Sequence, residues 1–460
     1  MSVRSVLRRD GSILSRIRLR PRLPRSTMAR LPPVAPTHLL RIYPREARRQ
    51  ASEPRRQEKL RSKVPLVRET RFGREAGHVR SRRVSAVGGH SPRIGSGPVT
   101  HRGDPREPAS SADVIMQEIR DGGYDMTSVL LLAIALLQSA PERAAMEAAW
   151  DYSKSCRGQT MVVLYDGKPV FERYASGGSP GTLQMLASGS KSFVGIAAIA
   201  AVEDGLLRLD DLACESLTEW KSDPQKSKIT YRHLLTLTSG LEPGGNLGRA
   251  RAYTWKQMIA KASKTAPGTA FEYGPSHLIA FAEALQRKLK GETFEAYLER
   301  RVFRPLGVKV EWRSRNADGN PQVAGGAAMT ARDWATFGDW VRLKGKRAGK
   351  HLIRASLFDE LSKGTPQNPA YGLTWWLVRP VTEQHKREIP IVRNELTGLL
   401  DASWVPSDTL IAAGLGKQRL YVIRSRNLVV VRQGPLIGGR RYNDAEFLSR
   451  LLRGKPASDR

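Results

Sequence analysis

The chain has 460 residues, a formal net charge of +32, two cysteines and eight histidines. This length is that of two or three domains. The histidines form no metal-ligand spacing, and no apolar run approaches the roughly 20 residues that a membrane-spanning helix needs. We therefore expect no metal or other cofactor and no stable membrane span.

The positive charge is concentrated in the first 125 residues. They hold 28 of the 76 basic residues and 12 of the 44 acidic ones. Their net charge is therefore +16, half of the total of +32. They are rich in Arg, Pro, Ser and Gly and show no apolar periodicity, so we expect them to be disordered. One interpretation is an arm that binds nucleic acid or an anionic surface. We favour the other, in which translation starts at Met126 and the mature domain binds no nucleic acid.

A short apolar run follows Met126. Residues 129–137 (VLLLAIALL) have the length of a signal-peptide core, and Ser139-Ala140 supplies small residues for cleavage. The run has no Lys or Arg between it and Met126, and the alternative is an ordinary buried helix. We interpret residues 126–140 as a signal peptide, which predicts a periplasmic or extracellular protein.

Export would expose the two cysteines to an oxidising compartment. Cys156 and Cys214 could then form a disulfide. Nothing in their spacing favours the pair over two separate buried thiols, so both alternatives stay open.

From about residue 141 to residue 460 the pattern is that of a folded domain. Residues 142–152 are helix-prone, and two apolar runs in 160–174 flank Asp166-Gly167, a strong hairpin-turn signal. Residues 188–203 predict a helix with an apolar face. The segment 206–360 is expected to be mostly helical, with helices near 232–237, 253–262, 277–289, 294–302 and 331–343.

The last part of the domain returns to strands. Apolar or β-branched runs predict strands at 409–415, 419–424 and 427–433, followed by a helix at 444–452. Strands thus occur at both ends of the domain, with helices between and beside them. This order predicts an α+β fold, in which both chain ends form one antiparallel sheet and the segment 206–360 is a mostly helical insertion.

The most informative motif is Ser188-Gly189-Ser190-Lys191, which has the form S-x-x-K and opens a predicted helix. Residues three apart on a helix share a face, so Lys191 can reach the Ser188 hydroxyl and act as its base. The helix N-terminus would favour a developing oxyanion. Taken alone, the motif is better explained as a serine N-cap with a solvated lysine.

The surrounding segments resemble the motifs of the penicillin-binding protein and class C β-lactamase family. Residues 186–193 (LASGSKSF) resemble its nucleophile motif. Further hallmarks follow in the family's order at 205–211 (GLLRLDD), 229–241 (ITYRHLLTLTSGL), 325–333 (GGAAMTARD) and 371–376 (YGLTWW). The resemblance covers about residues 145–455. It implies a β-lactamase/transpeptidase-like fold with Ser188 as nucleophile and Lys191 as base.

The family's second motif, Tyr-x-Asn or Tyr-x-Ser, is met in part. By resemblance Tyr273 would relay the proton between Ser188 and the leaving group. Pro275 stands where the family has Asn or Ser, which removes a side-chain amide. Ser276 and His277 follow and are candidate substrate contacts, although His277 is also explained as a helix-start residue.

The third motif, Lys-Thr-Gly or His-x-Gly, has lost its cation. Gly414 fits the pattern, but Ala412 stands where the family has Lys or His. The strand can still offer the backbone N–H of Leu415, which with the N–H of Ser188 would form an oxyanion hole. Lys417 is a candidate replacement for the missing cation.

These departures favour an ester or amide over a dedicated β-lactam substrate. β-Lactams carry a carboxylate that the third-motif cation helps to bind, and the resemblance is closer to esterase-like and 6-aminohexanoate-oligomer-hydrolase-like members. We expect a serine hydrolase that forms an acyl-enzyme on a small-molecule ester or amide, with Trp375 as a further candidate contact. The alternatives are a β-lactamase or D-Ala-D-Ala carboxypeptidase, and a catalytically weak binding protein.

Overall fold

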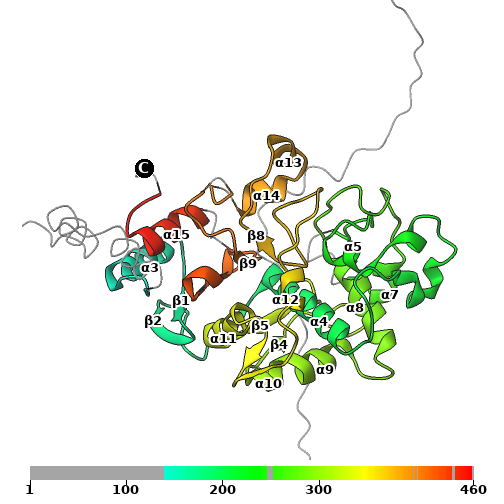
Figure 1. The fold of residues 1–460 in the computed structure, drawn as a ribbon, viewed down its shortest axis with the longest axis horizontal. Coiled ribbons are helices and arrows are strands. Elements are labelled where there is room, and N and C mark those ends of the chain that lie inside the picture. The colour runs from blue at the N-terminus through cyan, green and yellow to red at the C-terminus, as the bar shows by residue number, and fades with distance from the viewer. Residues whose placement is uncertain (1–138, 246–251, 397, 401, 438–440, 458–460) are drawn as a thin grey trace, which may run out of the picture. The chain divides into compact units, whose positions relative to one another are not determined.

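A computed structural model describes residues 139–457, apart from residues 246–251, 397, 401 and 438–440 (Figure 1). The arginine-rich segment and the apolar run after Met126 lie outside the described residues. Within the described part of the chain, no helix combines the length and the apolar character of a membrane-crossing segment. Cys156 and Cys214 are both buried and free, so this structure has two separate thiols.

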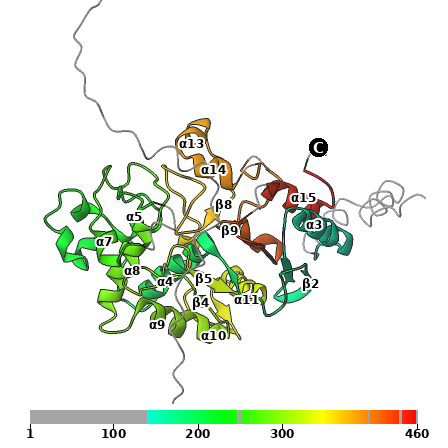
Figure 2. The ribbon, with the colours of Figure 1, turned by 180° about the vertical axis from the view of Figure 1, so that it is seen from behind.

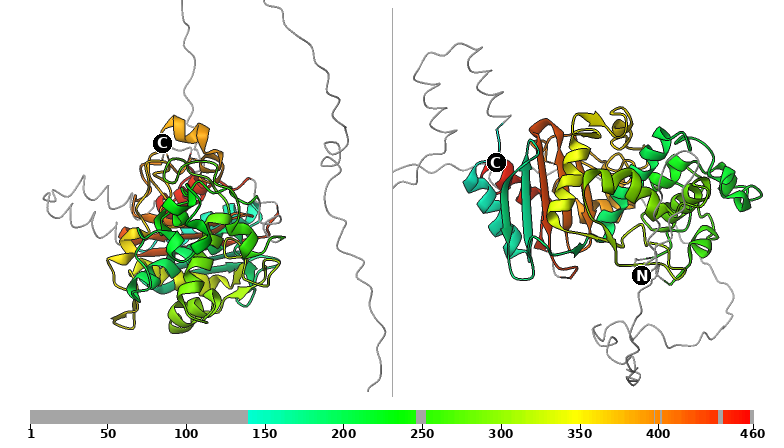
Figure 3. Two further views of the ribbon diagram at one scale, coloured as in Figure 1. Left: turned by 90° about the vertical axis from the view of Figure 1, so that its right-hand side faces the viewer. Right: turned by 90° about the horizontal axis from the view of Figure 1, so that it is seen from below.

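A six-stranded sheet holds the two ends of the domain together (Figure 3). Strand β1 pairs antiparallel with β11, so that Thr160 lies opposite Gln433. The spatial order of the strands is β2 (Lys168–Tyr174), β1 (Thr160–Tyr165), β11 (Leu428–Gln433), β10 (Gln418–Ile423), β9 (Thr409–Gly414) and β8 (Trp376–Leu377). The predicted antiparallel sheet from both chain ends is thereby confirmed.

The hairpin of β1 and β2 forms where the sequence predicts it. Asp166 and Gly167 form its turn with φ values of 46° and 75°. A turn with both central residues in the left-handed region matches the twist of the flanking strands, and Asp-Gly is among the few pairs that adopt it readily.

Helices cover both faces of the sheet, which explains why β9, β10 and β11 are buried along their whole length. On one face lie α3 (Arg143–Ser155) and α15 (Asp444–Arg453), which pack side by side (Figures 1 and 2). On the other face lies α11 (Ala331–Arg342). At Gly338 a Cβ atom would lie 2.6 Å from Leu420 and 2.8 Å from Val429, so glycine allows α11 to approach the strands closely.

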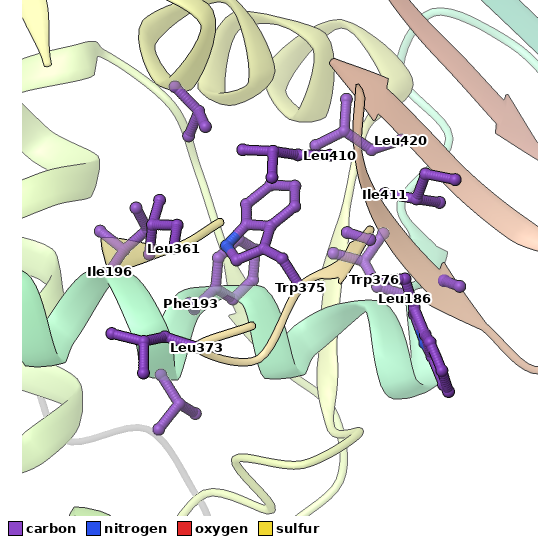
Figure 4. Packing of buried hydrophobic residues seen from close by; sticks show 14 of the residues in the cluster. Leu186, Phe193, Ile196, Leu361, Leu373, Trp375, Trp376, Leu410, Ile411 and Leu420 are labelled. Carbon is purple, nitrogen blue, oxygen red and sulfur yellow. The ribbon is translucent and has the colours of Figure 1, made fainter. Parts of the chain in front are cut away.

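Helix α4 (Lys191–Glu203) runs through the core beside the sheet (Figure 4). Its apolar residues Phe193 and Ile196 lie around Trp375, together with Leu373 and Leu410. A Cβ atom at Gly195 would lie 2.3 Å from the Leu373 carbonyl oxygen, so this helix and the segment before β8 touch through their backbones. The first turn of α4 is therefore fixed against the sheet.

The segment between the two sheet-forming parts is less regular than predicted. All five predicted helices are present, as α5 (Tyr231–Leu235), α7 (Trp255–Ile259), α8 (Ser276–Lys288), α9 (Phe294–Leu298) and α11, but three of them have only five residues. Caps fix where they begin: the Thr230 hydroxyl accepts a hydrogen bond from the His233 N–H at 3.2 Å, and His233 Nδ1 accepts one from the Thr230 N–H.

Short turns, strands and helices that the sequence did not reveal complete the described part of the chain. The 3-10 and π turns are η2 (Ala187–Ser190), η3 (Ala213–Glu215), η4 (Thr218–Trp220), η5 (Lys226–Lys228), η6 (Glu299–Phe303) and η7 (Arg424–Arg426). The small strands are β3 (Gln184–Met185), β4 (Glu311–Trp312), β5 (Ala327–Met329), β6 (Lys346–Arg347) and β7 (Lys350–His351). The remaining helices are α10 (Arg304–Leu306), α12 (Leu357–Glu360), α13 (Glu383–Glu388) and α14 (Pro390–Glu395).

Candidate active site

Ser188 lies in the 3-10 turn η2, immediately before α4. The residue before it, Ala187, is buried and has a φ of 47°, a left-handed conformation that costs a non-glycine residue energy. Hydrogen bonds hold this turn in place: the Ser190 hydroxyl donates to the Ala187 carbonyl at 2.8 Å and accepts from the Ala327 N–H at 3.1 Å. The surrounding structure thus presents Ser188 on a tight, strained turn.

Lys191 lies within hydrogen-bond distance of Ser188. Its Nζ is 3.0 Å from the Ser188 Oγ and donates to the Ala324 carbonyl oxygen at 2.7 Å. The lysine side chain is buried, with 3% of its surface exposed. The i, i+3 spacing places the two groups on one face, and the Ala324 carbonyl, 133 residues away in sequence, holds the amine there.

Tyr273 contributes its ring to the same place. The Lys191 Nζ lies 4.8 Å from the centre of the Tyr273 ring. Trp376 stacks on that ring with centres 5.8 Å apart, and Tyr371 packs edge-on against it at 6.3 Å. Burial raises the pKa of Tyr371 well above its usual value, with a smaller contribution from Tyr273. The structure therefore brings Ser188, Lys191 and Tyr273 into one aromatic-walled site.

Strand β9 passes directly behind the turn that holds Ser188. A Cβ atom at Gly414 would lie 2.0 Å from the Leu186 carbonyl oxygen and 3.1 Å from the Gly189 nitrogen, so only glycine permits this approach. Ala412, two residues earlier, shares this face of the strand. The residue in the place of the missing cation therefore faces the same side of the sheet as Ser188.

Three of the candidate substrate contacts are interior residues instead. Ser276, His277 and Trp375 have no exposed surface. The Ser276 hydroxyl donates to the Glu242 carbonyl at 2.6 Å, so it serves the start of α8. Successive strand residues point in opposite directions, and the structure places Trp376, not Trp375, against Tyr273. The prediction for these three residues is corrected accordingly.

Lys417 belongs to the turn between β9 and β10, where it has a φ of 58°. Burial raises the pKa of Asp444, which contacts the opposite face of the sheet, but the nearby charges of Arg419 and then Lys417 bring that pKa below its usual value. The Lys417 charge is thus felt by Asp444, and its role as a replacement for the cation missing at Ala412 stays a prediction.

His277 is fully buried and hydrogen-bonded through Nδ1 to the Ser239 hydroxyl at 2.7 Å. Burial lowers its pKa to about 4; a backbone hydrogen bond with Glu272 opposes this shift, and the charge of Lys191 adds to it. The imidazole is therefore neutral in the folded protein at neutral pH. It acts as an uncharged packing group behind the site.

The buried imidazole gives the protein a specific acid sensitivity. Between pH 6.5 and pH 4 only the unfolded chain protonates His277, so the stability that its neutral form contributes is complete above pH 6.5 and is lost as the pH falls toward 4. We expect the free energy of unfolding to fall by about 3 kcal/mol more in the wild type than in His277→Asn over this range. Urea unfolding at pH 7, 5.5 and 4 measures this, and parallel profiles for the two proteins would contradict it.

Two features of the site were not predicted from the sequence. The Ala324 carbonyl and the strained Ala187 come from a segment and a conformation that carry no local signal. A backbone carbonyl can come from any residue, and a left-handed alanine is not recognisable without its surroundings. Only the sequence Tyr371-Gly372 and the tryptophans after it pointed toward this part of the site.

The chain is similar in sequence to known hydrolases. A β-lactamase of Yersinia enterocolitica is 31% identical over 159 residues, which cover 32% of this chain and 40% of that protein. The lovastatin esterase of Penicillium rubens is 29% identical over 199 residues, 33% of this chain and 49% of the esterase. The chain thus spans less than half the length of either relative.

A solved structure extends the likeness in fold. EstCE1, described as a hydrolase with promiscuous acyltransferase activity, superimposes with a TM-score of 0.53 over 68% of this chain and 98% of its own, at 16% identity. Residues 140–432 match the Beta-lactamase family as a whole. The resemblance drawn from the motifs is therefore confirmed: the chain belongs to the Beta-lactamase family of serine hydrolases.

Proposed function

We propose that the protein hydrolyses an ester or amide of a small, apolar, uncharged acyl donor through an acyl-enzyme on Ser188. The observation that carries this proposal is the 3.0 Å separation between the buried Lys191 amine and the Ser188 hydroxyl. A serine hydroxyl needs a base within hydrogen-bond distance to become a nucleophile.

In the proposed reaction the Lys191 amine takes the hydroxyl proton as the Ser188 Oγ bonds to the substrate carbonyl carbon. The N–H groups of Ser188 and Leu415 stabilise the oxyanion. The bond to the leaving group then breaks, and that group departs with the proton, which Lys191 returns through the Tyr273 hydroxyl. Water next attacks the acyl carbon, gives a proton to Lys191, and releases the acid as Ser188 regains its hydrogen.

The surroundings favour an uncharged substrate. Ala412 leaves no cation on the strand face toward Ser188, and Pro275 offers no side-chain amide in the second motif. A carboxylate on the substrate would therefore lose the partner that β-lactams use in the family. This supports an ester or simple amide over a β-lactam.

An apolar surface beside β9 also favours an uncharged substrate. Leu415 and Ile437 expose 61% and 77% of their surface, and a Cβ atom at Gly416 would lie 2.8 Å from the Leu436 Cα. The turn after β9 and the segment after β11 thus touch, and both present aliphatic side chains. Such a surface would favour an apolar acyl or alcohol group. The 29% identity to an enzyme named lovastatin esterase is consistent with this.

A substrate panel on the full chain tests the proposal. The wild type is assayed with p-nitrophenyl acetate and butyrate, with nitrocefin, and with a fluorophosphonate probe. We expect labelling of one serine and ester hydrolysis that exceeds nitrocefin hydrolysis, with butyrate preferred over acetate. Faster nitrocefin hydrolysis would favour a β-lactamase, and neither turnover nor labelling would favour a binding protein that has lost activity.

A further inference from the structure

Two buried arginines lie directly behind the turn that joins β9 to β10. Arg419 on β10 and Arg432 on β11 are opposite each other in the antiparallel register, and neither has any exposed surface. Two like charges in this position destabilise a sheet unless other groups compensate them. Because burying two cations side by side costs free energy, we looked for a function that these arginines could serve.

Asp444 at the start of α15 compensates the first arginine. The Arg419 Nε donates to one Asp444 oxygen at 2.7 Å and its Nη2 to the other at 3.2 Å, while the Tyr421 hydroxyl donates to Asp444 at 2.6 Å. The ion pair leaves the Arg419 Nη1 directed at the turn. It donates to the Gln418 carbonyl at 3.0 Å and to the Gly414 carbonyl at 3.4 Å.

Arg432 has no carboxylate partner among the described residues. Its guanidinium donates to the carbonyl oxygens of Gly416, Lys417 and Cys156 at 3.0, 2.9 and 2.9 Å, and it lies 4.5 Å from the centre of the Tyr442 ring. Burial lowers the pKa of this guanidinium. Backbone carbonyls therefore supply most of the partners of a buried cation.

Together the two guanidinium groups bind the carbonyls of residues 414, 416, 417 and 418, which is nearly the whole turn. The carbonyl of Gly414 and the N–H of Leu415 belong to the same peptide group. A charged donor on a carbonyl fixes the plane of its peptide and polarises the N–H at the other side. The positive charge that the third motif lacks at Ala412 is thus present behind the strand instead.

We propose that Arg419 and Arg432 are positioning residues that orient and polarise the Leu415 N–H of the oxyanion hole. This assignment rests on the proposed function of the site. Neither side chain touches the substrate, because both act from the opposite face of the sheet. Their role is to hold an exposed turn in the one conformation that directs an N–H toward the acyl carbonyl.

Steady-state kinetics of Arg432→Met in the full chain tests this assignment. The variant removes the hydrogen bonds to the Gly416 and Lys417 carbonyls, keeps those of Arg419, and leaves no carboxylate unpaired. We expect kcat for p-nitrophenyl butyrate and the rate of fluorophosphonate labelling to fall together by about 10- to 100-fold, with KM nearly unchanged, since one oxyanion donor contributes about 100-fold or more. Arg432→Lys, which keeps the charge but not the three-way contact, is expected to recover part of kcat.

Arg342→Met is the control for the loss of a buried arginine elsewhere in the fold, because Arg342 lies on α11, where it pairs with Asp339 at 2.8 Å. We expect it to lower thermal stability without lowering kcat. If the wild type is active and Arg432→Met folds with an unchanged kcat, the positioning role is overturned but the proposed function stands. If Arg432→Met does not fold, the same kinetics are measured on Arg432→Gln, which also lacks the charge, and an unchanged kcat in that variant would overturn the positioning role. A wild type that neither labels nor turns over would overturn the proposed function, and this assignment with it.

Discussion

Ser188→Ala is expected to abolish fluorophosphonate labelling and to lower ester turnover by on the order of 10³-fold or more. The change removes the Oγ atom on which we propose that the acyl-enzyme forms, while the turn around it keeps its hydrogen bonds, because these are made by Ser190 and the backbone. The folded structure should therefore persist. Intact-mass spectrometry after incubation with the probe, together with initial rates on p-nitrophenyl butyrate, measures both effects.

Ser179→Ala is the control for this variant. Ser179 lies in an exposed loop and its hydroxyl pairs with Thr182 at 2.8 Å, so its loss should leave labelling and turnover at the wild-type level. Labelled Ser188→Ala protein would mean that another residue is the nucleophile. A circular dichroism spectrum identical to that of the wild type is needed to attribute the loss to chemistry.

Lys191→Met is expected to lower the rate of acylation by about 10²- to 10⁴-fold, the usual contribution of a general base. The methionine fills a similar volume, but it cannot accept the Ser188 proton or donate to the Ala324 carbonyl. Substrate binding depends on other groups, so the loss should appear in kcat rather than in KM. Stopped-flow measurement of the first p-nitrophenol release separates acylation from later steps.

Lys226→Met provides a chemically matched control. Lys226 is also a buried lysine that donates to backbone carbonyls, those of Ile259 and Ala260 at 3.5 and 3.3 Å, and burial lowers its pKa. It lies away from Ser188, so its replacement should affect stability and leave acylation unchanged. Equal losses of acylation in the two variants would show that a buried lysine matters only for folding.

The site combines a strained turn with a buried base, and both depend on distant segments. Ala187 keeps its left-handed conformation because β5 and β9 pack on either side of the turn: Ala327 accepts from the Leu186 N–H at 2.9 Å, and Gly414 leaves room for the Leu186 carbonyl. Strain of this kind persists only where the surroundings compensate it. The proposed oxyanion donor, Leu415, follows directly after β9, and the two arginines lie on the neighbouring strands β10 and β11.

The sequence by itself determined the elements whose signals are local. The Asp166-Gly167 hairpin, the helix after Ser188 and the strands before residue 434 follow from turn chemistry and from the periodicity of apolar side chains. The spacing of Ser188 and Lys191 also required their meeting, because a helix places residues three apart on one face. The order of the family's motifs along the chain was enough to identify the family.

Only the tertiary structure decided what surrounds those two residues. It placed Trp376 rather than Trp375 on Tyr273, and it buried Ser276 and His277. Each outcome depends on which face of a helix or strand packs against a segment that is distant in the sequence. A shift of one residue in the register would turn the opposite face toward that segment. The carbonyl of Ala324 and the guanidinium of Arg432 enter the site's environment for the same reason, since close packing brings together groups that no local pattern connects.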